Sequence, residues 1–258
     1  MSFGICHLSI IPLRAQASDK SEMVSQLLFG EHFEVLSEEP KWALIRTYHD
    51  SYEGYIDKKQ LFEINSKEFD ELSINRFPVV GAPIHVQAIE ANPPVYYLAG
   101  SILPFASKGV FKLRNESLLY NGMLSGARSN EFRPEAMKFL NAPYLWGGRT
   151  VFGIDCSGFT QLVYRLCGYT LPRDAHQQAE EGELIHLLEE SQEGDLAFFD
   201  NREGRITHVG IIVDAANEKQ IIHASGKVRI DKLDHQGIFD AKAGVYTHNL
   251  RLIKRMSI

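Results

Sequence analysis

Two short apolar segments near the C-terminus, each carrying one histidine, constrain the fold of this chain most. They are Thr207–Val213, which contains His208, and Ile221–Ser225, which contains His223. Both are rich in β-branched residues, as strands are, and the polar stretch Asp214–Lys219 between them suits a hairpin loop. The pattern therefore predicts two neighbouring antiparallel strands with a histidine in each.

The register of this hairpin decides whether the two imidazoles can meet. If Val213 pairs with Gln220, then Gly210 pairs with His223, and His208 lies two positions further along the same strand. Alternate residues of a strand share a face, so both rings point the same way, with their Cβ atoms about 7–8 Å apart. A slip of one residue would put them on opposite faces.

A second constraint is the segment Gly153–Phe159, which contains Cys156. Asp155 suits the N-cap of a helix and Gly168 suits its C-terminal end. The thiol then lies at a helix N-terminus, where the dipole lowers a cysteine pKa below its usual value of about 8.5. Small neighbours would leave backbone N–H groups free to bind an oxyanion. The helix is indicated by an apolar stripe of Phe159, Leu162, Val163 and Leu166.

Together these residues predict a Cys–His–His relay: Cys156 attacks, His208 moves the proton and His223 orients His208. Three alternatives stay open at this point: a structural buried cysteine, a core histidine satisfied by a hydrogen bond, and a zinc site. No closely paired ligand spacing supports zinc, so we expect no metal. Cys6 and Cys167 are expected in the core. The expected surface histidines are His49, His186 and His235.

The pattern of predicted secondary structure changes near residue 130. Before it, short strand-like segments alternate with polar turns, which indicates small barrels. After it, helical segments, including Arg133–Leu140, precede a run of strands, which indicates an α+β domain. The expected early strands are Glu31–Leu36, Lys41–Arg46, Asp50–Ile56, Ile84–Ile89, Val95–Ala99 and Gly109–Leu113, and the expected late ones add Leu196–Phe199.

Composition excludes several classes of protein. The 258 residues are 44% hydrophobic and carry a net charge of −6 without a basic run, so we expect no nucleic-acid partner. No apolar run reaches about 18 residues, so no membrane span is expected. The start Met1–His7 lacks the pattern of a secretory signal, and we expect a cytoplasmic protein.

A family resemblance emerges from six segments taken in order. The region resembles the NlpC-type papain-like cell-wall peptidases, which implies a papain-like catalytic domain over residues 129–258. The resemblance also implies Cys156 as nucleophile, His208 as base and His223 as orienting residue. The segments are Tyr144–Arg149, Asp155–Phe159, Leu171–Asp174, Gly194–Phe199, His208–Ile211 and Ile222–Ala224.

The N-terminal part resembles bacterial SH3-like barrels at Ser21–Glu31 and Asp50–Ile56. Two such barrels, expected at residues 1–64 and 65–128, precede the catalytic domain in YkfC-like γ-D-glutamyl-L-diamino acid endopeptidases. That likeness implies cleavage of murein tripeptides or tetrapeptides, L-Ala-γ-D-Glu-diamino acid, that have a free N-terminal L-Ala. It implies a role in cell-wall peptide recycling and no cofactor.

The same likeness suggests how the free amine is bound. A buried ammonium needs an acceptor and a countercharge. The candidate substrate-binding residues are Tyr52, Glu22, Asp155, Ser157 and Trp146. For Tyr52 the alternative is packing on its own barrel, and for Glu22 it is a solvated loop charge. One departure from the family pattern is Ala175, where relatives often carry a hydroxyl residue, so a substrate contact there is not expected.

Two other functions remain open from sequence. One is a secreted hydrolase that acts on intact peptidoglycan with the same chemistry. The other is a catalytically inactive murein-binding protein. The presence of Cys156, His208 and His223 disfavours the inactive form, and the missing leader disfavours the secreted one.

Overall fold

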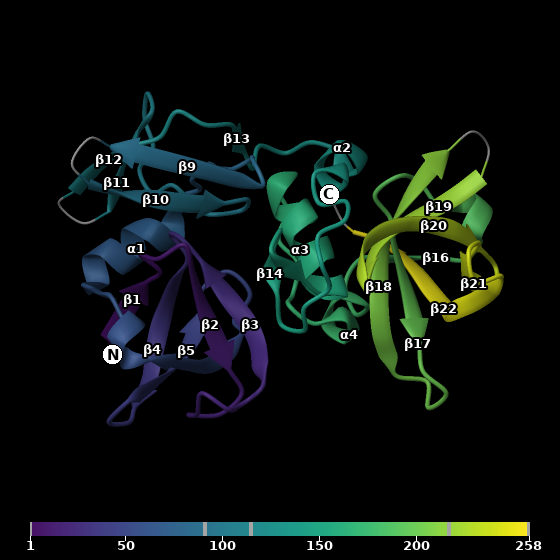
Figure 1. The fold of residues 1–258 in the computed structure, drawn as a ribbon, viewed down its shortest axis with the longest axis horizontal. Helices are drawn as coiled ribbons and strands as arrows, with labels where there is room; N and C mark the ends of the chain where they lie inside the picture. The colour runs from purple at the N-terminus through teal and green to yellow at the C-terminus, as the bar shows by residue number, and fades with distance from the viewer. Residues whose placement is uncertain (1, 90–91, 114–115, 216–217, 257–258) are drawn as a thin grey trace. The chain divides into compact units, whose positions relative to one another are not determined.

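The computed structural model describes residues 2–89, 92–113, 116–215 and 218–256. The chain divides into two compact units (Figure 1). Unit 1 contains Met1–Ala127 together with Trp146–Val151, and unit 2 contains Arg128–Leu145 together with Phe152–Ile258. The six-residue segment Trp146–Val151 thus belongs with the N-terminal unit although its neighbours on both sides belong to the other.

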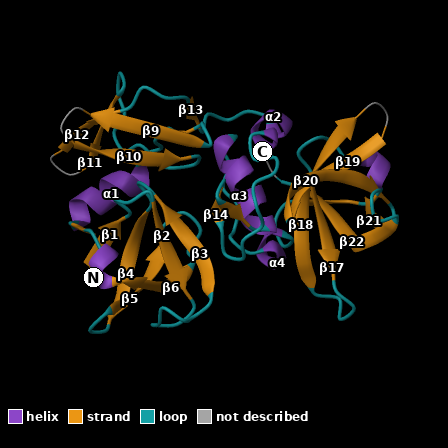
Figure 2. Ribbon diagram, viewed as in Figure 1, coloured by secondary structure: helices purple, strands orange, loops and turns teal. Residues whose placement is uncertain are grey.

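The first part of unit 1 is a seven-stranded antiparallel sheet in the order β3-β2-β6-β5-β4-β1-β7 (Figure 2). Its inward-facing side chains, among them Leu13, Phe33, Ile45 and Ile56, are fully buried in one apolar cluster. The early strands predicted from alternation are confirmed as β4, β5 and β6. The strand bounds are β1 Ser2–Ile5, β2 Ile10–Arg14, β3 Met23–Leu28, β4 His32–Glu38, β5 Trp42–Thr47, β6 Glu53–Asp57 and β7 Glu63–Ile64, with the 3₁₀ turn η1 at Lys58–Gln60.

A helix that the sequence analysis did not predict follows β7. Helix α1, Ser66–Ile74, has Asn65 as its N-cap. The Asn65 side chain accepts a hydrogen bond from the Glu68 backbone, and the Glu68 carboxylate accepts one from the Asn65 backbone. This reciprocal pair is a capping box, which starts a helix even in a polar segment. On its apolar side, Phe69 and Leu72 pack against Ile5 and Ile64.

The rest of unit 1 contains three antiparallel strand pairs around an aromatic cluster. Phe29, in the turn that follows β3, packs edge-on here, with its ring centroid 5.0 Å from that of Tyr97 and 5.8 Å from that of Phe111. The next residue, Gly30, has φ +81°, and a Cβ there would lie 2.2 Å from the Ile102 carbonyl oxygen, so only glycine fits. The pairs are β8 Val79–Val80 with β13 Leu124–Ser125, β9 Ile84–Ile89 with β10 Asn92–Leu98, and β11 Val110–Leu113 with β12 Glu116–Leu119.

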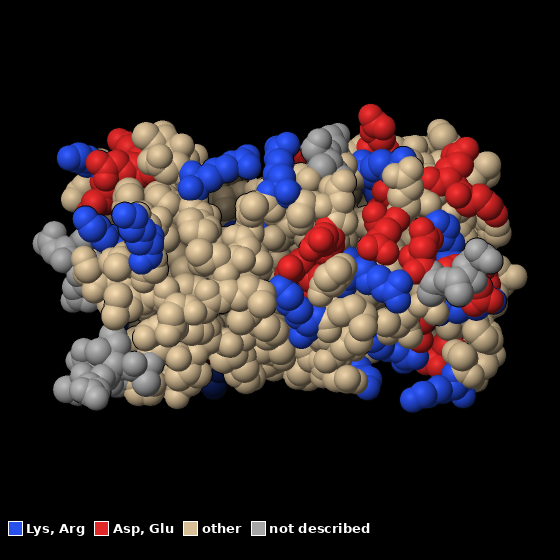
Figure 3. All heavy atoms as spheres, turned by 90° about the horizontal axis from the view of Figure 1, so that it is seen from above, with Lys and Arg blue, Asp and Glu red and all other residues tan. Residues whose placement is uncertain are grey.

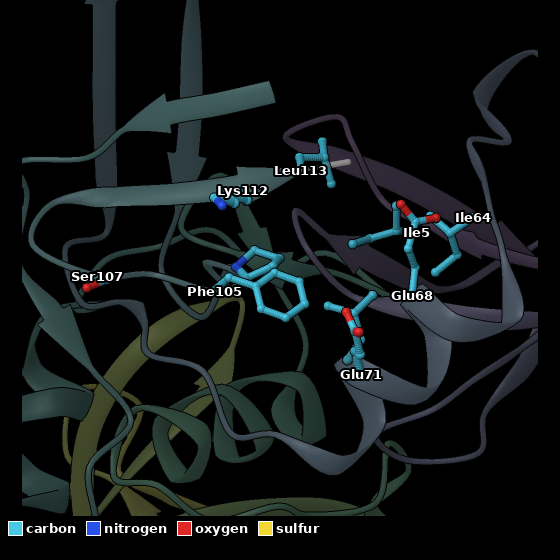
Figure 4. Close-up of a pocket in the computed structure, with 10 residues that line it drawn as sticks. Ile5, Ile64, Glu68, Glu71, Phe105, Ser107, Lys112 and Leu113 are labelled. Atoms are coloured by element: carbon cyan, nitrogen blue, oxygen red, sulfur yellow. The ribbon is translucent and has the colours of Figure 1, made fainter. Parts of the chain in front are cut away.

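A pocket of about 420 Å³ lies beside α1 in unit 1 (Figure 4). Its wall is mainly apolar, and Phe105 projects from it with 38% of its surface exposed. Glu68, Glu71 and Lys112 supply the charged lining. No candidate site residue from the sequence lines this pocket.

Unit 2 is built on a second seven-stranded antiparallel sheet, in the order β16-β22-β17-β18-β19-β20-β21. A further pairing of β21 with β22 closes the sheet on itself. The strand bounds are β16 Glu183–Ile185, β17 Leu196–Asp200, β18 Ile206–Ala215, β19 Glu218–Ser225, β20 Lys227–Asp234, β21 Gly237–Asp240 and β22 Val245–Arg255, and the short strand β15 Gly153–Ile154 precedes them. The short strand β14, Arg149–Thr150, belongs to unit 1.

The helices of unit 2 come before most of its strands, as the α+β prediction required. Helix α3, Cys156–Leu166, packs against β18 and β19 and presents a fully buried stripe to them. Gly168, with φ +84°, ends α3 as predicted. The predicted helix at Arg133–Leu140 is confirmed as α2, Phe132–Met137. The remaining turns are α4 Ala175–Gln178 and η2 Leu188–Glu190.

The predicted hairpin register is confirmed. Val213 pairs with Gln220 and Ile211 with Ile222. The expected six-residue loop is too long, because the ladder continues to Ala215 and Glu218. Residues 216 and 217 lie outside the described residues.

Charged side chains of both signs share the surface. On the face shown in Figure 3, Lys and Arg side chains are interspersed with those of Asp and Glu. None of the described helices is long and apolar enough to cross a membrane.

Candidate active site

Cys156 is the first residue of α3, as the sequence predicted. Asp155 is the N-cap, and its Oδ1 accepts a hydrogen bond of 2.7 Å from the Gly158 N–H. The helix is anchored because its apolar stripe is buried, and the Asp155 cap fixes where it begins. Together they hold the Cys156 thiol in a fixed place. The first-turn N–H groups of a helix are suited to bind a developing oxyanion.

A buried arginine holds the Asp155 carboxylate. Arg173 is 1% exposed, and its Nη1 and Nη2 lie 3.0 Å and 2.6 Å from Asp155 Oδ1 and Oδ2. Its Nη1 also lies 3.0 Å from Ser157 Oγ. Such a bidentate pair fixes geometry as well as charge. Sequence reasoning gave Arg173 no role, although it follows Pro172 in one of the family-like segments.

The environment of the thiol differs from the expectation. The pKa of Cys156 is raised to about 12, mainly by burial and also by the Asp155 carboxylate. Backbone hydrogen bonds from Val209 and Ser157 and the charge of Arg173 act in the opposite direction. The expected lowering by the helix N-terminus is therefore outweighed by desolvation, and the resting thiol is neutral.

The two predicted histidines meet on the sheet. His208, on β18, and His223, on β19, are 6% and 1% exposed. Nε2 of His208 lies 2.8 Å from Nδ1 of His223, with the rings edge to face at 83°. The predicted same-face placement is confirmed. The backbone of Val209, next to His208, hydrogen-bonds the Cys156 thiol, which brings this strand to the nucleophile.

Two residues that sequence reasoning missed complete the histidine cluster. His248, on β22, stacks on His208 with ring centroids 4.2 Å apart and an interplanar angle of 26°. Asp231, on β20, places Oδ2 2.9 Å from Nε2 of His223. The alternation of Arg229 and Asp231 in the strand after His223 is the signal that could have indicated the aspartate.

Burial favours the neutral form of His208 and His248. It lowers the pKa of His208 well below 6.5, and electrostatic interaction with the neighbouring rings of His223 and His248 acts in the same direction. Burial also lowers the pKa of His248 to about 4, against the opposing effect of Asp231. A neutral His208 ring can accept a proton at the moment of attack, which is what a general base requires.

The candidate amine-binding residues Tyr52, Glu22 and Trp146 belong to unit 1. Trp146 is 59% exposed, and its Nε1 donates a hydrogen bond to Glu22 Oε1. Tyr52 is partly buried against the core of the first sheet, as its structural alternative required. Asp155 and Ser157 belong to unit 2. The part of all five in substrate binding stays a prediction.

One surface prediction is wrong. His49 is only 13% exposed at its side chain, and its Nε2 lies 3.2 Å from Asp50 Oδ2 and 3.5 Å from Glu31 Oε1. Polar neighbours in sequence suggested solvent, but the ring lies among buried carboxylates. His186 and His235 are exposed and Cys6 and Cys167 are buried, as predicted.

No group of three or more His, Cys, Asp or Glu side chains in the described ranges has an arrangement that could hold a metal ion.

The sequence profile of the NlpC/P60 family matches residues 141–247. That of the bacterial dipeptidyl-peptidase Sh3 domain matches residues 13–61. These matches cover Cys156, His208, His223 and Asp231 and most of the first sheet.

Curated relatives span most of the chain. A γ-D-glutamyl-L-lysine dipeptidyl-peptidase of Bacillus subtilis is 30% identical, covering 73% of this chain and 69% of the relative. One of the same name from Bacillus cereus is 27% identical, covering 88% and 75%. Among solved structures, an NlpC/P60 family protein from Bacillus cereus has a TM-score of 0.75 at 20% identity, over 98% of this chain and 99% of that one.

Proposed function

Because this chain belongs to the NlpC/P60 family and is a cysteine peptidase, we propose that it hydrolyses the bond between γ-D-glutamate and the diamino acid of murein peptides. Both Bacillus relatives carry names that specify a γ-D-glutamyl-L-lysine linkage and a dipeptidyl product. The observation that carries the proposal is the 2.8 Å contact between His208 and His223 on the strands that face Cys156.

The proposed chemistry uses three residues. As the Cys156 sulfur attacks the γ-D-glutamyl carbonyl, His208 takes the thiol proton and then gives it to the leaving amine of the diamino acid. A thioester forms and the amide bond breaks. Water, deprotonated by His208, then releases L-Ala-D-Glu and restores the thiol. His223 holds the His208 ring throughout.

We further propose that the enzyme selects peptides with a free N-terminal L-Ala. Glu22 and Asp155 offer carboxylates, and Tyr52, Ser157 and Trp146 offer polar or aromatic contacts. The Trp146–Glu22 hydrogen bond supports this, because it fixes the orientation of an exposed carboxylate. Loss of a charge-assisted hydrogen bond costs about 1.5–3 kcal/mol, which corresponds to a rate loss of about 10- to 100-fold. Such selection suits recycling of released peptides in the cytoplasm.

The test is cleavage of L-Ala-γ-D-Glu-L-Lys and of its meso-diaminopimelate form, each with a free or an N-acetylated amine. We expect release of the dipeptide from the free peptides and at least about 10-fold slower cleavage of the acetylated ones. Cys156→Ala should be inactive and Cys167→Ala active. Equal cleavage of free and acetylated peptides would remove amine selection, and activity on intact sacculi would favour the secreted hydrolase.

A further inference from the structure

The hydrogen-bonded chain that begins at His208 continues beyond His223 to Asp231. Nε2 of His223 lies 2.9 Å from Asp231 Oδ2. In the ladder between β19 and β20, His223 pairs with Arg229 and Ile221 with Asp231. Asp231 is therefore the diagonal neighbour of His223 on the same face of the sheet. Its side chain is 8% exposed.

The second oxygen of this carboxylate is also engaged. Arg229 Nη2 lies 2.7 Å from Asp231 Oδ1 and 3.1 Å from Asp240 Oδ2. Burial raises the pKa of Asp231, but the hydrogen bonds from His223 and Arg229 outweigh it and the net pKa is lowered. Asp231 is thus an ionised carboxylate, which can only accept hydrogen bonds.

The ionised carboxylate determines where the imidazole protons are. Nε2 of His223 must carry hydrogen to donate to Asp231, which leaves the lone pair on Nδ1 as the acceptor in the 2.8 Å contact with His208. That lone pair can accept only from Nε2–H of His208. A neutral His208 with hydrogen on Nε2 has its own lone pair on Nδ1, the ring nitrogen that remains for the thiol proton.

We propose that Asp231 is a positioning residue that fixes the tautomers of both histidines and so makes Nδ1 of His208 the catalytic base. The inference rests on the proposed peptidase reaction and adds a fourth member to its relay. When the Cys156 proton moves to Nδ1 of His208, the Nε2–H bonds to His223 and Asp231 stay as they are. No proton moves beyond His208, and the carboxylate stabilises the imidazolium through His223.

A purely structural ion pair between Arg229 and Asp231 is the competing explanation. It predicts a loss of stability when Asp231 is changed, with no specific effect on the tautomers or on the chemical step. Two measurements separate the explanations, the histidine tautomers and the rate of the chemical step, because a loss of stability alone would change neither.

The first experiment reads tautomers in the unmodified protein, without any substrate. Two-bond ¹⁵N–¹H correlation spectra of histidine-labelled protein, assigned by single replacements, report which ring nitrogen carries hydrogen. We expect Nε2–H on both His208 and His223. In Asp231→Asn the amide can donate to Nε2, so His223 should shift toward the Nδ1–H form. A wild-type His223 with hydrogen on Nδ1 overturns the inference.

The second experiment compares Asp231→Asn with Asp234→Asn, the same change on the same strand at a carboxylate that bonds Tyr246 instead. For Asp231→Asn we expect kcat/KM on the free tripeptide to fall about 10- to 100-fold with KM nearly unchanged. The fall should be smaller than the roughly 10⁴-fold seen when an aspartate bonded directly to a catalytic histidine is changed to asparagine. Asp231→Glu should recover part of the loss.

Equal activity of the Asp231→Asn and Asp234→Asn variants overturns the inference even if the protein cleaves murein peptides. If the peptides are not cleaved, alkylation of Cys156 by iodoacetamide replaces turnover as the readout, and Asp231→Asn should slow it about 10-fold or more. The inference and the substrate assignment can therefore fail separately.

Discussion

Glu31 and Arg149, 118 positions apart in the sequence, form a bidentate ion pair of 2.9 Å at both contacts in the interior of unit 1. Glu31 is 0% and Arg149 1% exposed at their side chains. The Arg149 backbone N–H also donates to Gln26 Oε1. The pair fixes the segment Trp146–Val151, which ends five residues before Cys156, within the N-terminal unit.

Glu31→Gln should therefore destabilise unit 1 strongly. Removing one partner of a buried ion pair leaves an uncompensated charge and costs about 3–5 kcal/mol of the free energy of unfolding. Urea denaturation of the whole chain measures it. The matched control is Asp19→Asn, whose pair with Lys41 is 70% and 52% exposed and whose loss should leave stability almost unchanged. If both variants lost the same free energy of unfolding, the buried pair would contribute no more to stability than the exposed one, which would contradict the prediction.

The three cysteines should differ in reactivity toward iodoacetamide. All are buried, and burial raises the pKa of Cys167 to about 11 and that of Cys156 to about 12. Of the three, only Cys156 is hydrogen-bonded to the strand that carries His208, through the Val209 backbone, so Cys156 should be alkylated first. His208→Ala should slow its alkylation at least about 10-fold. Peptide mapping after partial alkylation measures this, and equal labelling of Cys167 would support an inactive protein.

Arg173→Lys tests the contact that holds the N-cap of α3. Lysine keeps the charge but loses the planar fork that binds both oxygens of Asp155, and it cannot reach Ser157 in the same geometry. We expect a loss of about 1–3 kcal/mol in stability and a lower kcat/KM. Arg205→Lys, at a pair with Glu203 that is 79% and 68% exposed, is the control and should change neither. A wild-type rate in Arg173→Lys would contradict a positioning role.

Stability should fall in mild acid. The pKa of His32 is lowered to about 4, mainly by burial and also by electrostatic interaction with His49, while Glu31 acts in the opposite direction. His248 also has a pKa of about 4. Below about pH 6.5 these two histidines bind protons in the unfolded chain but stay neutral in the folded protein. The free energy of unfolding therefore decreases as the pH falls from about 6.5 to about 4.

Urea midpoints across this pH range measure the effect. His32→Gln should flatten the dependence, because one buried imidazole is removed. His235→Gln should leave it unchanged, since that ring is 66% exposed. A urea midpoint that rises as the pH falls from 6.5 to 4 would contradict the prediction, because buried neutral histidines must lower stability in this range.

The parts of the fold and site that sequence predicted correctly depend on local signals. Asp155, the apolar stripe and Gly168 define α3 within one short segment. The β18–β19 register follows from two adjacent apolar runs, and it brings His208 to His223. Each of these features needs only neighbouring residues and the period of a helix or strand.

The missed features divide into two kinds. Helix α1 had a readable signal, the Asn65–Glu68 capping box, but no element was predicted in this polar segment. The Glu31–Arg149 pair had none, because its partners are far apart in sequence. Asp231 becomes visible only once the register of the third strand is known. Likewise, a helix N-terminus predicts a lowered thiol pKa, whereas the burial that reverses it is a property of the folded unit.

The central claim is that the γ-D-glutamyl group passes through a thioester on Cys156. Rapid acid quench of the enzyme with L-Ala-γ-D-Glu-L-Lys, followed by digestion and mass spectrometry, tests it most directly. We predict the L-Ala-γ-D-Glu acyl group on the peptide that contains Cys156 and none on those with Cys6 or Cys167. Cleavage of the tripeptide by Cys156→Ala at the wild-type rate, with no acylated peptide in the wild type, would contradict it.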